Sequence, residues 1–221
     1  MFQKVIVVED IDSISLSVRH VLENVGVPTI EIVKYCDDAW TKIKAAAALG
    51  EPFQLLLTDL SFEKDYRAVE LVGGEALLEV VHAQYPDLKT LVYSIEDKSF
   101  RIKKLYEVQG ISGYVLKGRR SLEKLKVALQ TLAADKLYYD PELQAQLRDQ
   151  GFVSLDAYEI LLLQQLAAGS SLDEMEQYCR DQGVKPCSKS AIEKRLYRIR
   201  DAFEAKNLTH LVGLAKDRGV V

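Results

Sequence analysis

Five polar residues with side chains suited to metal or phosphoryl chemistry stand at the ends of short apolar runs. They are Glu9, Asp10, Asp59, Ser94 and Lys117, which follow the runs 4–8, 53–58, 88–93 and 113–116. Short apolar runs bounded by turn-forming residues are typical of strands that are buried on both faces of a parallel sheet. Because ligands bind at the carboxyl ends of the strands in open α/β sheets, we expect these side chains to meet at one edge.

The types of these side chains indicate what that edge could bind. Neighbouring carboxylates raise one another's pKa unless a cation neutralises them, and all-oxygen ligands suit Mg²⁺. A pure metal site would need neither the hydroxyl of Ser94 nor the ammonium of Lys117. Both groups would bind the oxygens of a phosphoryl group carried by one of the carboxylates. The set therefore predicts phosphoryl chemistry assisted by Mg²⁺.

The elements that must position these residues alternate along the first 132 residues. Apolar residues such as Ile14, Val18 and Val21 recur at helical spacing after the first run, and 29–35 alternates as a strand. A succession of βαβ units requires right-handed crossovers and a parallel sheet. The predicted fold is therefore α/β, a doubly wound five-stranded parallel sheet. One connection is unusual, because the polar segment 61–72 exceeds the roughly two to six residues common between a strand and a helix.

The chain changes character after residue 132. We expect residues 133–150 to form a linker with a helix beginning at Asp140-Pro141, and 151–221 to form a small all-α domain of four helices. Around the third of these helices, over 185–206, seven lysines and arginines outnumber three acids. A local basic stripe on an amphipathic helix can neutralise phosphates whatever the total charge of the chain.

Composition and charge limit the class of protein. No apolar run is long enough for a membrane span, and the first residues lack the pattern of a secretion signal, so we expect a cytoplasmic protein. Cys36, Cys179 and Cys187 form no metal-binding spacing, and we expect ordinary reduced thiols. The net charge of −4 argues against nonspecific nucleic-acid binding by the chain as a whole.

The first part of the chain resembles the receiver domain of bacterial two-component response regulators, which has a CheY/flavodoxin-like fold. The resemblance covers residues 1–132 and depends on five separated positions that agree in order and strand placement. It implies that Asp59 is the phosphoacceptor and takes a phosphoryl group from a partner sensor histidine kinase. The other implied roles are a Mg²⁺ site formed by Asp10, Asp59 and the carbonyl of Ser61, with Glu9 acting through water, phosphate binding by Lys117 and Ser94, and a switch at Tyr114.

The last part resembles the LuxR/NarL type of helix-turn-helix DNA-binding domain, over residues 154–221. The resemblance implies promoter DNA as a partner, and a homodimer, because a single small domain of this kind reads only a half-site. The implied contacts are Ser190, Glu193, Lys194 and Tyr197 to base edges or the nearby backbone, and Lys189, Arg195 and Arg198 to phosphates.

Two features of this last part depart from the LuxR/NarL pattern. Several extra residues around 180–187 lengthen the turn before the recognition helix, and Glu193 stands where the family often has lysine. A carboxylate in the groove repels phosphate but can accept a hydrogen bond from the amino group of cytosine. Glu193 could therefore shift the sequence preference without abolishing DNA binding.

The sequence as a whole predicts a transcriptional response regulator, not an enzyme, in which phosphorylation of Asp59 changes dimerisation and DNA binding. One alternative keeps the receiver but has a C-terminal domain that binds protein, because Glu193 and the longer turn would impair DNA contact. Another is a Mg²⁺-dependent phosphatase with Asp59 as its nucleophile. This alternative is less compatible with the sequence, because no other acid lies near Asp59 at the spacing that a general acid would need.

Overall fold

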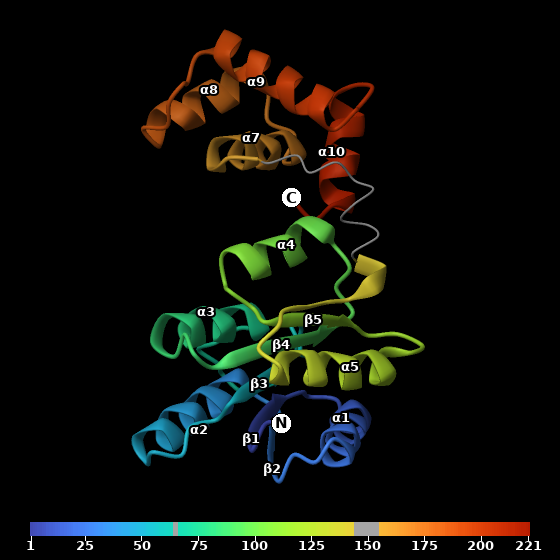
Figure 1. Cartoon of the computed structure of the whole chain (residues 1–221). Coiled ribbons are helices and arrows are strands. Elements are labelled where there is room, and N and C mark those ends of the chain that lie inside the picture. Colours follow the sequence, from blue (N-terminus) through green and yellow to red (C-terminus); the bar gives the residue numbers. More distant parts are fainter. Residues whose placement is uncertain (64–65, 144–154) are drawn as a thin grey trace. The chain divides into compact units, whose positions relative to one another are not determined.

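The computed structural model describes residues 1–63, 66–143 and 155–221. The chain divides into two compact units, one organised around a β-sheet and the other containing the C-terminal helices (Figure 1). Within the described residues, no helix has both the length and the apolar character needed to cross a bilayer. The domain boundary predicted near residue 150 lies outside the described residues.

Six parallel strands form the sheet, in the order β2-β1-β3-β4-β5-β6. The strands are β1 (Lys4–Val8), β2 (Thr29–Val33), β3 (Leu55–Thr58), β4 (Lys89–Ser94), β5 (Gly113–Leu116) and β6 (Tyr138–Tyr139). The first five are the predicted strands, so the predicted parallel α/β fold is confirmed. Val8 of β1 is paired with Thr58 of β3, and the next residues, Glu9 and Asp59, therefore leave the sheet at the same edge.

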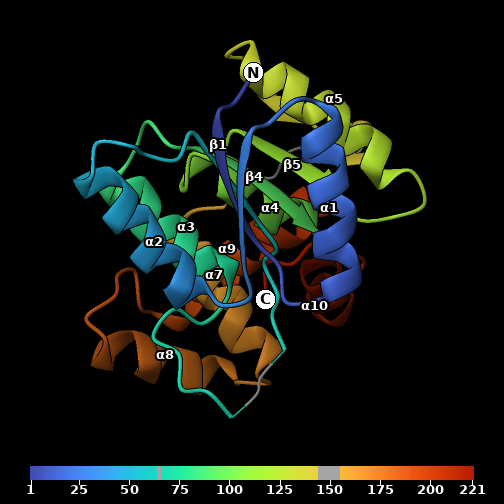
Figure 2. The same ribbon diagram turned by 90° about the horizontal axis from the view of Figure 1, so that it is seen from below.

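Five helices cover the two faces of this sheet (Figures 1 and 2). They are α1 (Asp12–Asn24) and α5 (Ser121–Ala133) on one face, and α2 (Cys36–Ala48), α3 (Gly74–Gln84) and α4 (Ser99–Glu107) on the other. Along β1, Val5 and Val7 pack under the first pair of helices, whereas Ile6 and Val8 pack under the other three. Because both faces are covered, the inner strands β1 and β3 are continuous apolar runs, and their ends are easily recognised in the sequence, whereas the edge strand β2 alternates.

The sixth strand extends the five predicted strands at one edge and lies within the segment that was predicted to be a linker. Tyr138 donates its backbone N–H to the carbonyl of Ser112 at 3.0 Å, and its own carbonyl accepts from the Tyr106 hydroxyl at 2.5 Å. The Tyr106 and Tyr139 rings stack, with centroids 4.6 Å apart. Two residues are too few to produce a strand pattern in a sequence. Of the helix predicted from residue 141, the structure describes only the first residues, 141–143.

The long segment after β3 returns to the sheet through two glycines. Gly73 has a φ of 90°, which residues with side chains rarely adopt. A Cβ on Gly74 would lie 1.9 Å from the carbonyl oxygen of Asp59. Only a residue without a side chain can approach the Asp59 backbone so closely. The two glycines therefore allow the chain to pass directly beside Asp59 at the carboxyl edge of the sheet.

Among its described residues, the second unit contains four helices around their own apolar core. They are α7 (Ala157–Ala167), α8 (Leu172–Asp181), α9 (Lys189–Ala202) and α10 (Leu208–Asp217). Both α7 and α8 begin with a capping box, formed by Asp156 with Glu159 and by Ser171 with Glu174. Such reciprocal bonds satisfy backbone N–H groups that a helix start leaves unpaired. The described part of this region is helical, as predicted.

Candidate functional site

Three of the predicted residues meet at the carboxyl edge of the sheet. The Lys117 ammonium donates hydrogen bonds to Asp59 Oδ2 at 2.6 Å and to Glu9 Oε2 at 2.8 Å. These residues follow β5, β3 and β1, which parallel pairing brings to one edge. None of the three side chains is more than 8% exposed. Their charges therefore interact in surroundings that screen them much less than water does.

Burial and ion pairing act in opposite directions on the pKa values of this cluster. Burial raises the pKa of Glu9, and the hydrogen bond and charge of Lys117 only partly offset that rise. Burial by itself would lower the pKa of Lys117, but its hydrogen bonds to Asp59 and Glu9, together with their charges, leave the pKa raised. Lys117 is therefore held as an ammonium, the form that can neutralise phosphoryl oxygens.

The Asp59 carboxylate is held in one orientation. Its Oδ1 accepts backbone N–H groups from Leu60 at 2.6 Å and from Ser61 at 3.3 Å, while Oδ2 faces Lys117. The ammonium also lies 5.2 Å from the centroid of the Tyr93 ring. Tyr93 was not among the predicted site residues, and its position directly before Ser94 is the signal in the sequence that could have indicated it. The two Asp59 oxygens thus have different surroundings, one fixed by the backbone and one beside a cation.

Asp10 and Ser61, two of the predicted metal ligands, have other neighbours than Glu9 and Asp59, which contact Lys117. Asp10 Oδ2 accepts the backbone N–H of Glu63 at 2.7 Å, and Asp10 and Ser61 both line a cavity of about 1010 Å³. In the part of the chain that the structure describes, no three acidic, histidine or cysteine side chains are grouped to hold a metal ion. Lys117 instead supplies the cation for Glu9 and Asp59. Carboxylate and carbonyl oxygens beside an open cavity are nevertheless the donors that suit Mg²⁺.

Ser94 and Tyr114 are both fully buried, and both contact the backbone of Glu96, directly after β4. The Tyr114 hydroxyl donates to the Glu96 carbonyl at 2.6 Å, and Ser94 Oγ accepts the Glu96 N–H at 3.5 Å. The backbone N–H of Lys117 donates to the Ser94 carbonyl at 2.8 Å. The predicted hydroxyl and the predicted switch residue are therefore connected through one short segment beside the lysine.

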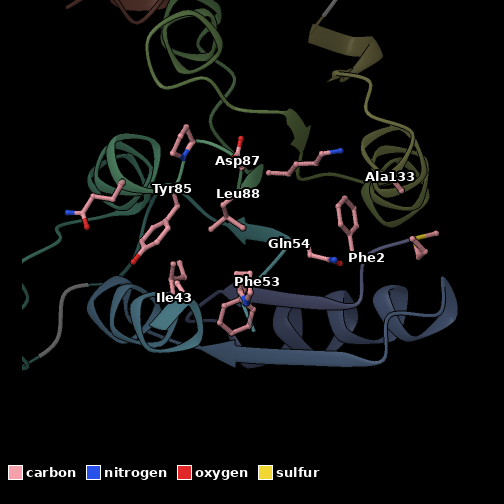
Figure 3. A pocket seen from close by; sticks show the side chains of 14 residues that line it. Phe2, Ile43, Phe53, Gln54, Tyr85, Asp87, Leu88 and Ala133 are labelled. Carbon is pink, nitrogen blue, oxygen red and sulfur yellow. The ribbon is translucent and has the colours of Figure 1, made fainter. Parts of the chain in front are cut away.

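A second cavity lies at the opposite, amino-terminal edge of the sheet and has a volume of about 570 Å³ (Figure 3). Its lining is largely apolar and includes Phe2, Ile43, Phe53, Tyr85 and Leu88. None of the predicted site residues lines it. Glu9, Asp59 and Lys117 lie instead at the carboxyl edge of the sheet.

In the helical unit, α9 presents four of the predicted contact residues on one exposed face. They are Ser190, Glu193, Lys194 and Tyr197, which are spaced by three or four residues. On the other face, Ile192, Leu196 and Ile199 are buried in the core of the unit. The amphipathic pattern of the sequence therefore placed this face correctly toward solvent.

The three predicted phosphate contacts of α9 are all ion-paired within the helical unit. The pairs are Lys189 with Asp173, Arg195 with Asp156 and Glu159, and Arg198 with Glu159. Glu159 is only 2% exposed, and its Oε1 lies 2.9 Å from Arg195 and 2.8 Å from Arg198. These arginines therefore hold α9 to α7. This role could not be predicted from the sequence of α9, because the acids lie at other helices.

No protein-family model matches the chain, but solved structures do. The RcsB response regulator of Salmonella typhimurium superimposes with a TM-score of 0.69 at 18% identity, over 97% of this chain and 99% of that chain. The chain has the fold of RcsB. RcsB from Salmonella enterica serovar Typhimurium, bound to promoter rprA in the presence of the phosphomimetic BeF₃⁻, matches with a TM-score of 0.63, 19% identity and 97% and 98% coverage.

The isolated receiver domain of RcsB matches separately, with a TM-score of 0.54 and 21% identity over 65% of this chain and 96% of that domain. The predicted likeness to a LuxR/NarL-type response regulator, a receiver followed by a helix-turn-helix domain, is therefore confirmed at the level of the fold. RcsB has also been solved as two dimers bound to two parallel DNAs. At identities of 18–21%, the comparison with RcsB establishes only the fold of this chain. Its chemistry must be argued from its own residues.

Proposed function

We propose that this chain is a cytoplasmic transcriptional response regulator controlled by phosphorylation of Asp59. The observation that carries the proposal is the bridge that Lys117 makes between Asp59 and Glu9 at the carboxyl edge of a parallel sheet. A partner sensor histidine kinase would supply the phosphoryl group. Full-length similarity to the fold of RcsB supports the assignment of the receiver and of the DNA-binding output.

Phosphoryl transfer would begin with attack of a carboxylate oxygen of Asp59 on the phosphorus of a phosphohistidine. The O–P bond forms as the N–P bond breaks, and the histidine nitrogen keeps the bonding electrons. We assign Oδ2 as the attacking oxygen, because Oδ1 is held by two backbone N–H groups. Lys117 neutralises the oxygens of the incoming group. A Mg²⁺ ion held by Glu9, Asp10, Asp59 and the Ser61 carbonyl would supply further charge neutralisation.

The transferred group would change the balance of charge among Glu9, Asp59 and Lys117. By analogy with other phosphorylated side chains it adds about −1.5 to −2 charges, so Lys117 is drawn toward it and its bond to Glu9 weakens. The Ser94 hydroxyl can then donate to a phosphoryl oxygen. Because Ser94 and Tyr114 both bond to the backbone of Glu96, movement of the serine would shift that backbone and so displace the tyrosine. This is the switch that we propose for the receiver.

The output would be binding of promoter DNA by a homodimer. The exposed face of α9 offers Ser190, Glu193, Lys194 and Tyr197 to the major groove. Glu193 would accept from the amino group of a cytosine, and Lys194 would donate to a guanine or a phosphate. A duplex with two half-sites about one helical turn apart would match two such helices in a dimer.

Acyl-phosphate labelling of the full chain tests the receiver function. We expect acetyl phosphate with Mg²⁺ to label the wild type and the exposed control Asp87→Asn, but not Asp59→Ala. Chelation of Mg²⁺ should abolish the label in the wild type and in Asp87→Asn. In fluorescence anisotropy, the labelled protein should then bind a promoter duplex more tightly than the unlabelled protein. Equal labelling of Asp59→Ala would remove Asp59 from the mechanism.

One observation favours a second candidate, a response regulator whose helical unit binds protein instead of DNA. Lys189, Arg195 and Arg198 are each paired with an acid of the same unit, which lowers the positive charge available to phosphates. The two candidates differ in how binding responds to salt. DNA binding should weaken steeply as salt rises from about 50 to 200 mM, because counterions are released from the phosphates. Flat salt dependence, or no duplex binding, would favour the protein-binding candidate.

A further inference from the structure

Asp140 is a fully buried acid that the proposed chemistry does not use. It directly follows the two-residue strand β6, in the segment that leads from the sheet toward the helical unit. Buried carboxylates are rare unless they are paired and hydrogen-bonded, because transfer of a charge out of water is costly. The position of Asp140 therefore requires an account of what it binds.

Three donors converge on the Asp140 carboxylate. Oδ2 accepts the backbone N–H of Leu116 at 3.0 Å, and Oδ1 accepts the backbone N–H of Glu142 at 3.0 Å. The Lys124 ammonium of α5 lies 3.1 Å from Oδ1 and also pairs with Glu142 at 2.8 Å. Burial by itself would lower the pKa of Lys124, but these bonds leave the pKa raised. An ionised carboxylate, with two acceptor oxygens and no donor, suits this set of partners.

The hydrogen bond to Leu116 connects Asp140 to the residue that directly precedes Lys117 in the sequence. Leu116 is the last residue of β5, and the next residue is Lys117, which bridges Glu9 and Asp59. The β5–β6 pairing stops at Tyr114 opposite Tyr139, so beyond it the Asp140 side chain ties the segment to β5. The backbone beside Lys117 is therefore bonded directly to the segment that follows the sheet.

That segment is anchored along its described length. The Tyr138 carbonyl accepts from Tyr106, the Tyr139 ring stacks on the Tyr106 ring, and Leu143 is buried in the core of the sheet unit. A shift of Leu116 would therefore meet a short, well-packed segment. Such a segment can transmit a displacement, because packed contacts favour discrete arrangements.

We propose that Asp140, held by Lys124, is a positioning residue that couples the state of Lys117 to the segment 138–143. When a phosphoryl group on Asp59 draws Lys117, the displacement passes through Leu116 to Asp140 and changes how firmly the segment is held. This inference rests on the proposed function and extends it, because it names the route by which the receiver signals toward the output helices. Asp140 touches no reacting atom, and its role is exerted through Leu116.

Hydrogen exchange of the full chain, with and without acetyl phosphate and Mg²⁺, tests the coupling. In the wild type we expect phosphorylation to change the exchange rate of the peptide 138–143 by at least about fivefold, the lower end of usual allosteric couplings. In Asp140→Asn, Asp59 should still be labelled, but the change at 138–143 should disappear. The matched control is Glu142→Gln, which removes an exposed partner of Lys124 but leaves the Leu116 bond, and it should behave like the wild type.

The outcomes distinguish the coupling through Asp140 from the phosphorylation of Asp59 on which it depends. If the wild type takes no label, both fall together. If Asp140→Asn is labelled and its peptide 138–143 still responds like the wild type, the coupling is refuted and the phosphoacceptor stands. If Asp140→Asn does not fold, the double variant with Lys124→Gln removes both charges, so that neither is left unpaired. The same loss of response is then expected, and a preserved response refutes the coupling.

Discussion

Substitution of Lys117 by methionine should strongly destabilise the cluster of Glu9, Asp59 and Lys117. Methionine has a similar length, but it leaves Glu9 and Asp59 without the ammonium that neutralises both. Removal of one partner from a buried ion pair typically costs about 3–5 kcal/mol, because the remaining charge is buried and uncompensated. Lys117 is 8% exposed, so solvent screens little of this interaction. We therefore expect the free energy of unfolding of the sheet unit to fall by about 3–5 kcal/mol at pH 7.

The loss should depend on pH, with a sign set by Glu9. Burial raises the pKa of Glu9 in the folded protein, and without Lys117 nothing comparable lowers it. Between the unfolded pKa of 4.5 and the raised folded value, the folded variant binds more protons than the unfolded chain. Its stability therefore falls as pH rises through this window. We expect Lys117→Met to be more stable near pH 5 than at pH 7, relative to the wild type.

The wild type also loses stability as pH rises, but in the alkaline range and because of Lys117. The pKa of Lys117 is raised above 10.5 in the folded state, so its contribution is complete below 10.5 and is lost as pH rises through the folded value. Lys117→Met lacks this alkaline loss. The difference in stability between the two proteins should therefore narrow at both ends of the pH range and be greatest near neutrality.

Urea denaturation followed by tryptophan fluorescence provides the assay. Trp40 is the single tryptophan of the chain and lies on α2, with its ring 5.8 Å from that of Tyr85. It therefore reports unfolding of the sheet unit. The exposed Lys126→Met is the control and should change stability by less than about 0.5 kcal/mol. A loss below about 1 kcal/mol for Lys117→Met, or a loss that does not change between pH 5 and 7, would refute the reasoning.

Three further predictions concern other parts of the chain. Burial raises the pKa of Cys36 from 9.0 to about 12, so at pH 8 its thiol should react with Ellman's reagent roughly a thousandfold more slowly in the folded protein than in urea; comparable rates would contradict the packing of α2. Gly74→Ala should destabilise the sheet unit in the same urea assay by about 3 kcal/mol and reduce acyl-phosphate labelling, because its Cβ would meet the Asp59 carbonyl. Lys194→Ala should lower the salt slope of DNA binding, measured by anisotropy, by about one, whereas the ion-paired Lys189→Ala should change it less.

The sheet and its corner could be predicted because burial on both faces leaves a clear record in the sequence. Each apolar run ends where a strand ends, and the parallel topology then brings Glu9, Asp59 and Lys117 to the same edge. Nothing in that pattern shows which carboxylate the lysine contacts. Asp10 bonds to the backbone of Glu63 because the long segment after β3 folds back over it. The conformation of such a segment depends on tertiary contacts that have no periodicity.

The sixth strand and Asp140 could not be predicted for a related reason. The strand has two residues, and its pairing with β5 is a long-range contact that local propensity does not encode. Asp140-Pro141 is a common helix-start pattern, and that interpretation gave no reason to expect a buried carboxylate. Only the donors from Leu116, Glu142 and Lys124, which packing brings together, explain why an acid is stable there.

The ion pairs of α9 change what its basic residues mean. A count of charges over 185–206 indicates a phosphate-binding stripe, but the buried Glu159 binds Arg195 and Arg198 and would be left uncompensated without them. These arginines therefore stabilise the fold before they can serve DNA. The exposed face that remains has adjacent charges of opposite sign, Glu193 and Lys194, which favours reading of base edges over nonspecific attraction. If the chain binds DNA as we propose, its affinity would then come from pairing two such faces, and a receiver that controls dimerisation would control binding.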